Sequence, residues 1–152
     1  MAGQLSTELI KELREKTGAG ISDIKKALEE SGGDVDKATA LIERKLGSLA
    51  GKRAGREARA GVIDAYIHSN GKIGAMVELF CETDFVSRNA DFRELAHDLA
   101  MQLAAMDPVD EQTFLEQPFI KEQNKSVRDL INEAAGKFGE NIKLGKFIRF
   151  EL

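Results

Sequence analysis

The sequence contains very few of the residues that form disulfides, base-stacking surfaces and rigid kinks. Its 152 residues include one cysteine, no tryptophan, one tyrosine and two prolines. A single cysteine, Cys81, excludes an internal disulfide and a zinc site built from several thiolates. The shortage of Trp and Tyr argues against a surface on which bases stack. The net charge of −4 argues against direct nucleic acid binding, which needs a concentrated basic surface.

Long apolar runs are also absent. No stretch approaches the roughly 20 apolar residues that span a bilayer, and the N-terminal residues MAGQLSTELI lack the apolar core of a signal peptide. We therefore expect a cytoplasmic protein that does not bind membranes. A hydrophobic content of 42% with 32% charged residues is ordinary for a folded globular chain.

Residues 1–47 carry the pattern of three short helices. Ser6 or Thr7 can cap the first helix, Ser22 precedes the second, and Asp34 can cap the third. Apolar residues recur at helical spacing in three groups, which are Leu5, Leu9, Ile10 and Leu13; Ile24, Ala27 and Leu28; and Val35, Ala38, Leu41, Ile42 and Leu46. Such a small core is marginal alone, and docking on the rest of the chain would stabilise it.

Residues 48–60 are small and basic, which indicates a helical connector. It contains four basic residues, which are Lys52, Arg53, Arg56 and Arg59. Two interpretations stay open for them: a solvated linker face, or a patch that faces a partner.

From residue 61 the hydrophobic period changes from helical to alternating, on either side of Asn70-Gly71. This dipeptide is typical of a type I′ hairpin turn. A two-residue turn pairs His68 with Ile73 and, further along, Ala60 with Cys81. The tail LGKFIRFEL predicts a last strand.

Two longer helices are expected between the hairpin and the last strand. Asp91 can cap the first, and Pro108 ends it. Residues 109–124 predict a loop with a short helical turn, and Gly139 ends the second helix. The fold class is therefore α+β: an N-terminal three-helix bundle, then residues 61–152 as a small antiparallel sheet of about three strands with helices packed on it.

No pattern is typical of catalysis or metal binding. The predicted register places His68 roughly 26 Å from Cys81, at about 3.3 Å per residue, and the distance from His97 to Cys81 is left open. TGAG lacks the GxxxxGK[ST] pattern of a phosphate loop, and no H-E-x-x-H or EF-hand spacing occurs. We expect neither an enzyme nor a cofactor or metal site, and we interpret Cys81 as a small core residue.

The stretch CETDFVSRNADF, from Cys81 to Phe92, places an aromatic residue in a short acidic loop. Phe85 could fold back and fill the space between sheet and helix. Alternatively, it could be presented at the loop tip, where an aromatic side chain is a good interface anchor. Composition and periodicity do not decide between the two.

Several stretches together resemble the elongation factor Ts family. They are ELREKTGAGISDIKKALEESGGDVDKA, CETDFVSRNADF, YIHSNGKIG and QPFIKEQNKSV…FGENIKLGKFIRFEL, in the family's order and over nearly the whole chain. The resemblance implies that residues 1–47 form a bundle of the ubiquitin-associated (UBA) type. It also implies a guanine nucleotide exchange factor for elongation factor Tu, in a bacterial or organellar translation compartment.

The resemblance implies roles for individual residues. In the signature Thr83-Asp84-Phe85-Val86, Phe85 would wedge between helices of the GTPase and Asp84 would disturb its magnesium environment. Further positions match family contacts with the GTPase, which are Arg14, Ile21, Ser22, Arg53 and His68. An exchange factor needs only differential binding, so this role agrees with the lack of a catalytic pattern.

The chain also departs from the family pattern. Ile21-Ser22 stands where methionines are usual, and Ser87 where alanine is common. Longer family members have a second core subdomain and a coiled-coil insertion, whereas short members work as homodimers, so the resemblance implies a homodimer here. Two other hypotheses compete with exchange: an adaptor whose core only dimerises, and a small thiol enzyme that uses Cys81.

Overall fold

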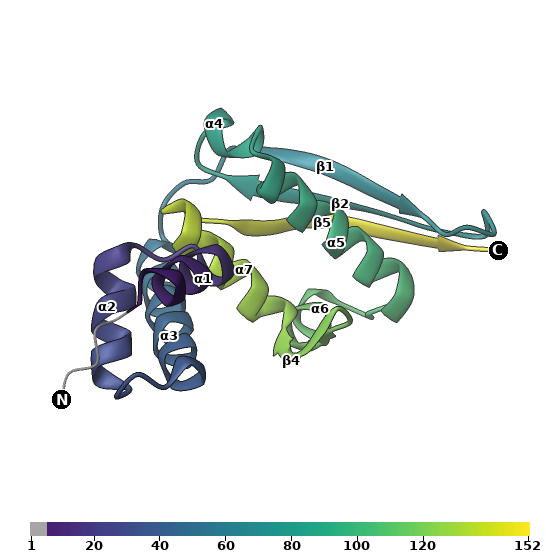
Figure 1. Cartoon of the computed structure of the whole chain (residues 1–152). Coiled ribbons are helices and arrows are strands. Elements are labelled where there is room, and N and C mark those ends of the chain that lie inside the picture. The colour runs from purple at the N-terminus through teal and green to yellow at the C-terminus, as the bar shows by residue number, and fades with distance from the viewer. Residues whose placement is uncertain (1–5) are drawn as a thin grey trace.

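The computed structural model describes residues 6–152 as a helical bundle packed against a helix-and-sheet core (Figure 1). The elements in chain order are α1 (Thr7–Thr17), α2 (Ile21–Glu30), α3 (Val35–Arg53), β1 (Ala60–Ile67), β2 (Ile73–Cys81), α4 (Asp84–Ser87), α5 (Ala90–Met106), α6 (Glu111–Glu116), β3 (Pro118–Phe119), β4 (Glu122–Ser126), α7 (Val127–Phe138) and β5 (Lys143–Glu151). The predicted α+β class is confirmed. None of the helices in the described part combines the length and apolarity needed to cross a membrane.

The N-terminal bundle forms around the apolar residues predicted from helical spacing. Ser6 caps α1 by accepting a hydrogen bond from an N–H of the first turn, and Asp34 caps α3 in the same way, as predicted. The helix α2 begins at Ile21, so the expectation that Ser22 precedes it is wrong. Leu5, at the start of the predicted stripe, lies outside the described residues.

The core sheet has the strand order β1-β2-β5 and is antiparallel throughout. Ala60 pairs with Cys81, which confirms the predicted hairpin register. The type I′ turn is wrong, because it requires positive φ at both central residues and only Gly71 has it, at 69°. The turn is instead closed by the Gly71 N–H, which donates to the His68 carbonyl at 2.8 Å.

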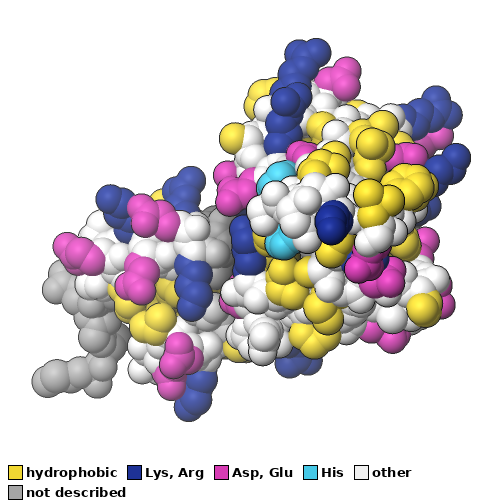
Figure 2. Space-filling view, turned by 90° about the vertical axis from the view of Figure 1, so that its right-hand side faces the viewer, with side chains coloured by type: hydrophobic (Ala, Val, Ile, Leu, Met, Phe, Trp, Pro, Cys, Tyr) yellow, Lys and Arg dark blue, Asp and Glu magenta, His cyan; other side chains and the backbone are white. Residues whose placement is uncertain are grey.

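The two faces of the sheet differ in cover. The face that includes Val77, Leu79 and Cys81 is buried under α5 and α7. The other face leaves large apolar side chains exposed, which are Ile63, Ile67, Met76, Ile148 and Phe150. Figure 2 looks at the hairpin end and shows hydrophobic side chains gathered to the right of the two histidines.

The helix α5 buries one apolar stripe, which consists of Phe92, Leu95, Ala96, Leu99, Ala100 and Leu103, but its cap is not the predicted one. The Asn89 side chain accepts the Asp91 N–H at 2.8 Å, so Asn89 is the cap and the prediction of Asp91 is wrong. Within the stripe, fully buried Gln102 donates to the Pro118 carbonyl and accepts the Ile120 N–H. These bonds hold the β3–β4 hairpin, which the prediction of a loop with one helical turn missed; the helical turn itself is α6.

The bundle docks on the core mainly through α3 and α7. A Cβ built on Gly136 of α7 would lie 2.8 Å from the Leu46 Cβ, so glycine permits this close approach of the two helices. Beside it, the Lys125 ammonium lies 2.9 Å from a Glu43 oxygen and 3.1 Å from a Glu133 oxygen. Burial opposes the charge of Lys125, but its hydrogen bonds to the two carboxylates prevail and raise its pKa. An apolar contact and an ion cluster therefore join the two parts.

Candidate protein-binding site

The signature stretch forms a sharp, exposed tip at the end of β2. The Thr83 hydroxyl caps the short helix α4 by accepting the Val86 N–H at 3.3 Å. Asp84 is exposed, and Phe85 is 86% exposed, the largest exposure of any phenylalanine among the exposed large hydrophobics. The alternative in which Phe85 fills the core is therefore wrong.

The other side of α4 is an anchor. Val86 is 5% exposed and belongs to the core cluster, and Ser87 is 6% exposed. The Ser87 hydroxyl donates to the Asp84 carbonyl at 3.0 Å, which tightens the single turn. Val86 was expected among the contact residues, but in this structure it is covered by its own core. Its side chain anchors the tip on the core and is not part of the exposed surface.

The loop between α7 and β5 holds the base of the tip through hydrogen bonds. One oxygen of the Glu140 carboxylate accepts the N–H groups of Glu82 and Thr83, both at 3.0 Å, and the other accepts the Thr83 hydroxyl at 2.7 Å. The Glu82 carboxylate in turn accepts the Asn141 N–H at 2.7 Å. Sequence reasoning missed this contact, because the two loops lie 57 to 59 residues apart and no local pattern joins them.

Cys81 has the environment of a structural residue. It is fully buried, and burial together with the nearby Glu140 carboxylate raises the pKa of its thiol to about 11. His97 pairs with Asp64 at 3.2 Å. Asp64 is four residues along β1 from Ala60, the partner of Cys81, which corresponds to roughly 13 Å. Neither histidine is placed to activate the thiol.

The predicted contact residues of the bundle surround its first interhelical turn. Arg14 lies in the last turn of α1, and Ile21 and Ser22 open α2; all three are exposed. Gly18 makes the turn between them with φ at 71° and packs against the Lys137 side chain of α7. The turn is thereby fixed to the core, with the three side chains on its outer side.

Two further predicted residues lie elsewhere. Arg53 ends α3 and is half-buried, and its buried Nη1 has no hydrogen-bond partner among the described residues. His68 is exposed at the hairpin turn, where its ring nitrogen lies 3.2 Å from the Tyr66 hydroxyl. The turn is at the opposite end of the sheet from α4 (Figure 1). The structure therefore does not bring His68 and Phe85 into one site.

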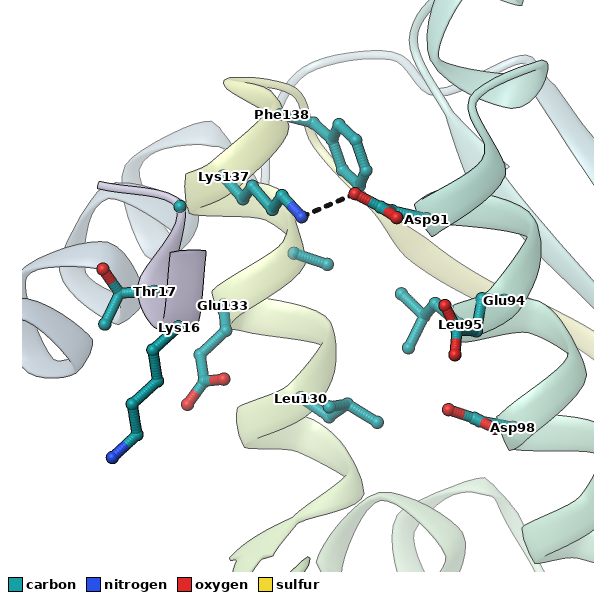
Figure 3. A pocket seen from close by; sticks show the side chains of 12 residues that line it. Lys16, Thr17, Asp91, Glu94, Leu95, Asp98, Leu130, Glu133, Lys137 and Phe138 are labelled. Atoms are coloured by element: carbon teal, nitrogen blue, oxygen red, sulfur yellow. Dashed lines mark hydrogen bonds and ion pairs between the residues drawn. The ribbon is translucent and has the colours of Figure 1, made fainter. Parts of the chain in front are cut away.

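A cleft of about 260 Å³ is lined by the end of α1, by α5 and by α7 (Figure 3). Its polar walls are largely paired: Lys137 lies 2.8 Å from Asp91, and Asp98 accepts a hydrogen bond from Lys121 at 2.6 Å. In residues 6–152, no three His, Cys, Asp or Glu side chains gather as metal ligands would. What the surface offers is an apolar tip on a fixed base, which suits contact with another protein.

Comparison with known proteins identifies the family. A family model described as Elongation factor TS matches residues 82–152. The Elongation factor Ts of Thermodesulfovibrio yellowstonii is 42% identical over 192 aligned residues, covering 97% of this chain and 96% of that protein. The Elongation factor Ts of Thermotoga petrophila is 40% identical over 192 residues, covering 98% and 96%. These alignments exceed the 152 residues of this chain, so the relatives contain segments that it lacks. The chain belongs to the elongation factor Ts family of translation elongation factors.

Proposed function

We propose that this protein is a guanine nucleotide exchange factor for elongation factor Tu and acts without covalent chemistry. The observation that carries the proposal is Phe85, 86% exposed on a capped helix turn, next to exposed Asp84. An exposed aromatic on a fixed base can bury a large area in a partner at little cost in conformational entropy. Asp84 presents a carboxylate beside it, where it can compete for a cation.

The mechanism requires only a difference in affinity between two states of the GTPase. A bound guanine nucleotide is held by backbone amides at its phosphates and by magnesium. Insertion of Phe85 next to this site favours the empty or distorted state. By linkage, the factor weakens nucleotide binding by the same ratio by which the nucleotide weakens binding of the factor. GTP in excess then displaces the factor.

We assign the remaining contacts to the bundle and propose a division of the chain into three parts. Residues 1–47 form a module whose Arg14, Ile21 and Ser22 hold the GTPase, residues 48–60 are the connector, and residues 61–152 are the core domain. The exposure of Arg14, Ile21 and Ser22 supports this assignment, because they flank Gly18, which packs against the Lys137 side chain of the core. Arg53 and His68 are secondary contacts in this proposal.

The proposal is tested by the release of a fluorescent GDP analogue from elongation factor Tu, with and without the protein. Native protein should accelerate release, and Phe85→Ala should remove most of the acceleration. Val109→Ala is the matched control, since Val109 is 88% exposed but lies after α5 and away from the tip. No acceleration by the native chain would overturn the proposal. If the double variant Asp84→Ala/Phe85→Ala accelerates release as fully as the native protein, the tip has no role in exchange and the core serves only for dimerisation.

We also propose that the protein is a homodimer joined through the outer face of the sheet. Five large apolar side chains are exposed on this face, and among residues 6–152 no further strand pairs with the edge strands β1 and β5. Phe150, 68% exposed, lies beside Gly74 in the neighbouring strand. Sedimentation should therefore give a dimer for the native chain and a monomer for Phe150→Asp. A native chain that is monomeric at micromolar concentration and fully active contradicts the dimer.

A further inference from the structure

The helix α4 is too short to fix its own direction. It spans Asp84–Ser87, a single turn, and isolated turns of this length are unstable because nucleation costs more than one hydrogen bond returns. Val86 and Ser87 anchor its inner side, and after the turn the Arg93 guanidinium donates to the Ser87 carbonyl at 3.3 Å. On the other side of the turn, where the chain leaves β2, the direction of the tip depends on what holds residues 82 and 83.

The Glu140 carboxylate is the group that acts there. It accepts three hydrogen bonds from two consecutive residues: the backbone N–H groups of Glu82 and Thr83 and the Thr83 hydroxyl. That hydroxyl is also the acceptor for the Val86 N–H, so Glu140 orients the very oxygen that caps α4. Hydrogen bonds to a carboxylate are stronger than those between neutral groups, and three of them fix position as well as direction.

The loop that carries Glu140 is itself held rigidly. Gly139 ends α7 with φ at 70°, which turns the chain toward the tip. The next residue after Glu140, Asn141, is 7% exposed, and its side chain donates to the Arg56 carbonyl at 2.7 Å. The Asn141 N–H donates to the Glu82 carboxylate, so each loop both donates hydrogen bonds to the other and accepts hydrogen bonds from it. The brace is therefore connected to α7 and to the segment that leads out of the helical bundle.

We propose that Glu140 is a positioning residue for the Asp84–Phe85 tip and sets the efficiency of nucleotide exchange without contacting the GTPase's nucleotide. This inference rests on the exchange function proposed above. A carboxylate suits the place because it only accepts hydrogen bonds and all three groups that face it are donors. Glutamine keeps one accepting oxygen and presents an NH₂ donor to the other side, whereas alanine removes every bond.

The exchange assay separates positioning from binding. Glu140→Ala should lower the maximal rate of GDP release at saturating factor about 10-fold, because a displaced contact group loses productive geometry. The factor concentration that gives half the maximal effect should change less than about 3-fold, since the bundle contacts remain. Glu140→Gln should be intermediate. Glu116→Gln, at the exposed end of α6 where the chain enters β3, is the matched control and should equal the native protein.

Coupling to Phe85 gives a readout that a general loss of stability would not produce. If Glu140 acts through Phe85, then Phe85→Ala/Glu140→Ala should be no slower than Phe85→Ala alone, because the positioned group is already gone. Full addition of the two losses, or a native rate for Glu140→Ala, overturns the inference. A native protein that does not accelerate release instead overturns the exchange function itself.

Hydrogen exchange of the free protein tests the brace without any GTPase. In Glu140→Ala the amides of Thr83 and Val86 should exchange at least ~10-fold faster, while those in the middle of α7 stay within about 2-fold of native. Unchanged protection of Thr83 and Val86 would show that Glu140 does not hold the tip. This result stands whether or not the protein proves to be an exchange factor.

Discussion

Two phenylalanines seven residues apart should respond in opposite ways to truncation. Phe85 is 86% exposed on the tip, whereas Phe92 is fully buried in α5 and packs edge-to-face against Phe138 with ring centroids 6.2 Å apart. We predict that Phe85→Ala leaves the free energy of unfolding nearly unchanged, while Phe92→Ala lowers it strongly. The comparison is internally matched, since the same atoms are removed from the same chain.

The magnitudes follow from the covered area. A phenylalanine side chain buries up to about 200 Å². Phe85 has only about 14% of its area covered, so its truncation gives up roughly 30 Å². At about 25 cal/mol per Å² this is below ~1 kcal/mol, and the better helix propensity of alanine offsets part of it. Truncation of Phe92 also leaves a cavity, and such changes cost about 3–5 kcal/mol.

Urea unfolding measures both values. The midpoint for Phe92→Ala should fall clearly below the native midpoint at an unchanged slope, and that of Phe85→Ala should coincide with it. All variants must be compared at one protein concentration, because the stability of a dimer depends on concentration. A Phe85→Ala midpoint as low as that of Phe92→Ala would refute the reasoning, because the ring would then be part of the core.

Three further predictions concern residues other than phenylalanine. Gly136→Ala should destabilise the protein by about 1–3 kcal/mol in urea unfolding, because its Cβ would meet the Leu46 side chain. The control is Gly47→Ala, which has open space around it and should be neutral or stabilising by up to ~1 kcal/mol. Lys125→Met should destabilise by about 2–3 kcal/mol at pH 7, less than a fully buried pair, because the two nearest carboxylates keep 23–29% exposure. The pKa of Lys125 is raised on folding, so the stability that its charge contributes is complete below the unfolded pKa of about 10.5 and is lost as the pH rises through the higher folded pKa. The difference in unfolding free energy between the native protein and Lys125→Met should therefore shrink above pH 10.5. Cys81, with its pKa raised to about 11, should resist iodoacetamide at pH 8 in the native protein and react on unfolding, as mass spectrometry can follow.

Much of the fold could be predicted because its signals are local. Alternation around Asn70-Gly71 gave the strand register, including the pair Ala60–Cys81 at the far end. Helical spacing located the helices to within a few residues, but the prediction of a helical connector over residues 48–60 is wrong beyond Arg53, where α3 ends and the chain runs without helix to β1. Predictions failed where several local choices compete. Asn89 and Asp91 are both good caps, and the structure uses the first.

The rest depends on contacts between distant residues. Nothing near Gln102 indicates that its amide holds the β3–β4 hairpin, and nothing near Glu140 indicates that it braces Thr83. The exposure of Phe85 is of the same kind, because periodicity cannot tell a ring that fills a gap from one that is presented. The sequence could name the tip as a candidate, but only the packing of Val86 and Ser87 shows which side of α4 faces outward.

A presented aromatic is useful only if it is also held still, and these demands conflict at the end of a strand. A free loop would expose Phe85 but would lose rotamer and backbone freedom on binding, about 0.5–1.5 kcal/mol for each side chain immobilised. Burial of the ring would remove this cost together with the contact surface. The structure meets both demands by fixing the backbone instead of the ring: Val86 packs inward, and the Glu140 carboxylate holds the two residues before the tip. The backbone part of the ordering cost is then met during folding and only the rotamer freedom of the ring is lost on binding, so for the proposed exchange role more of the contact energy of Phe85 is available to distort the partner.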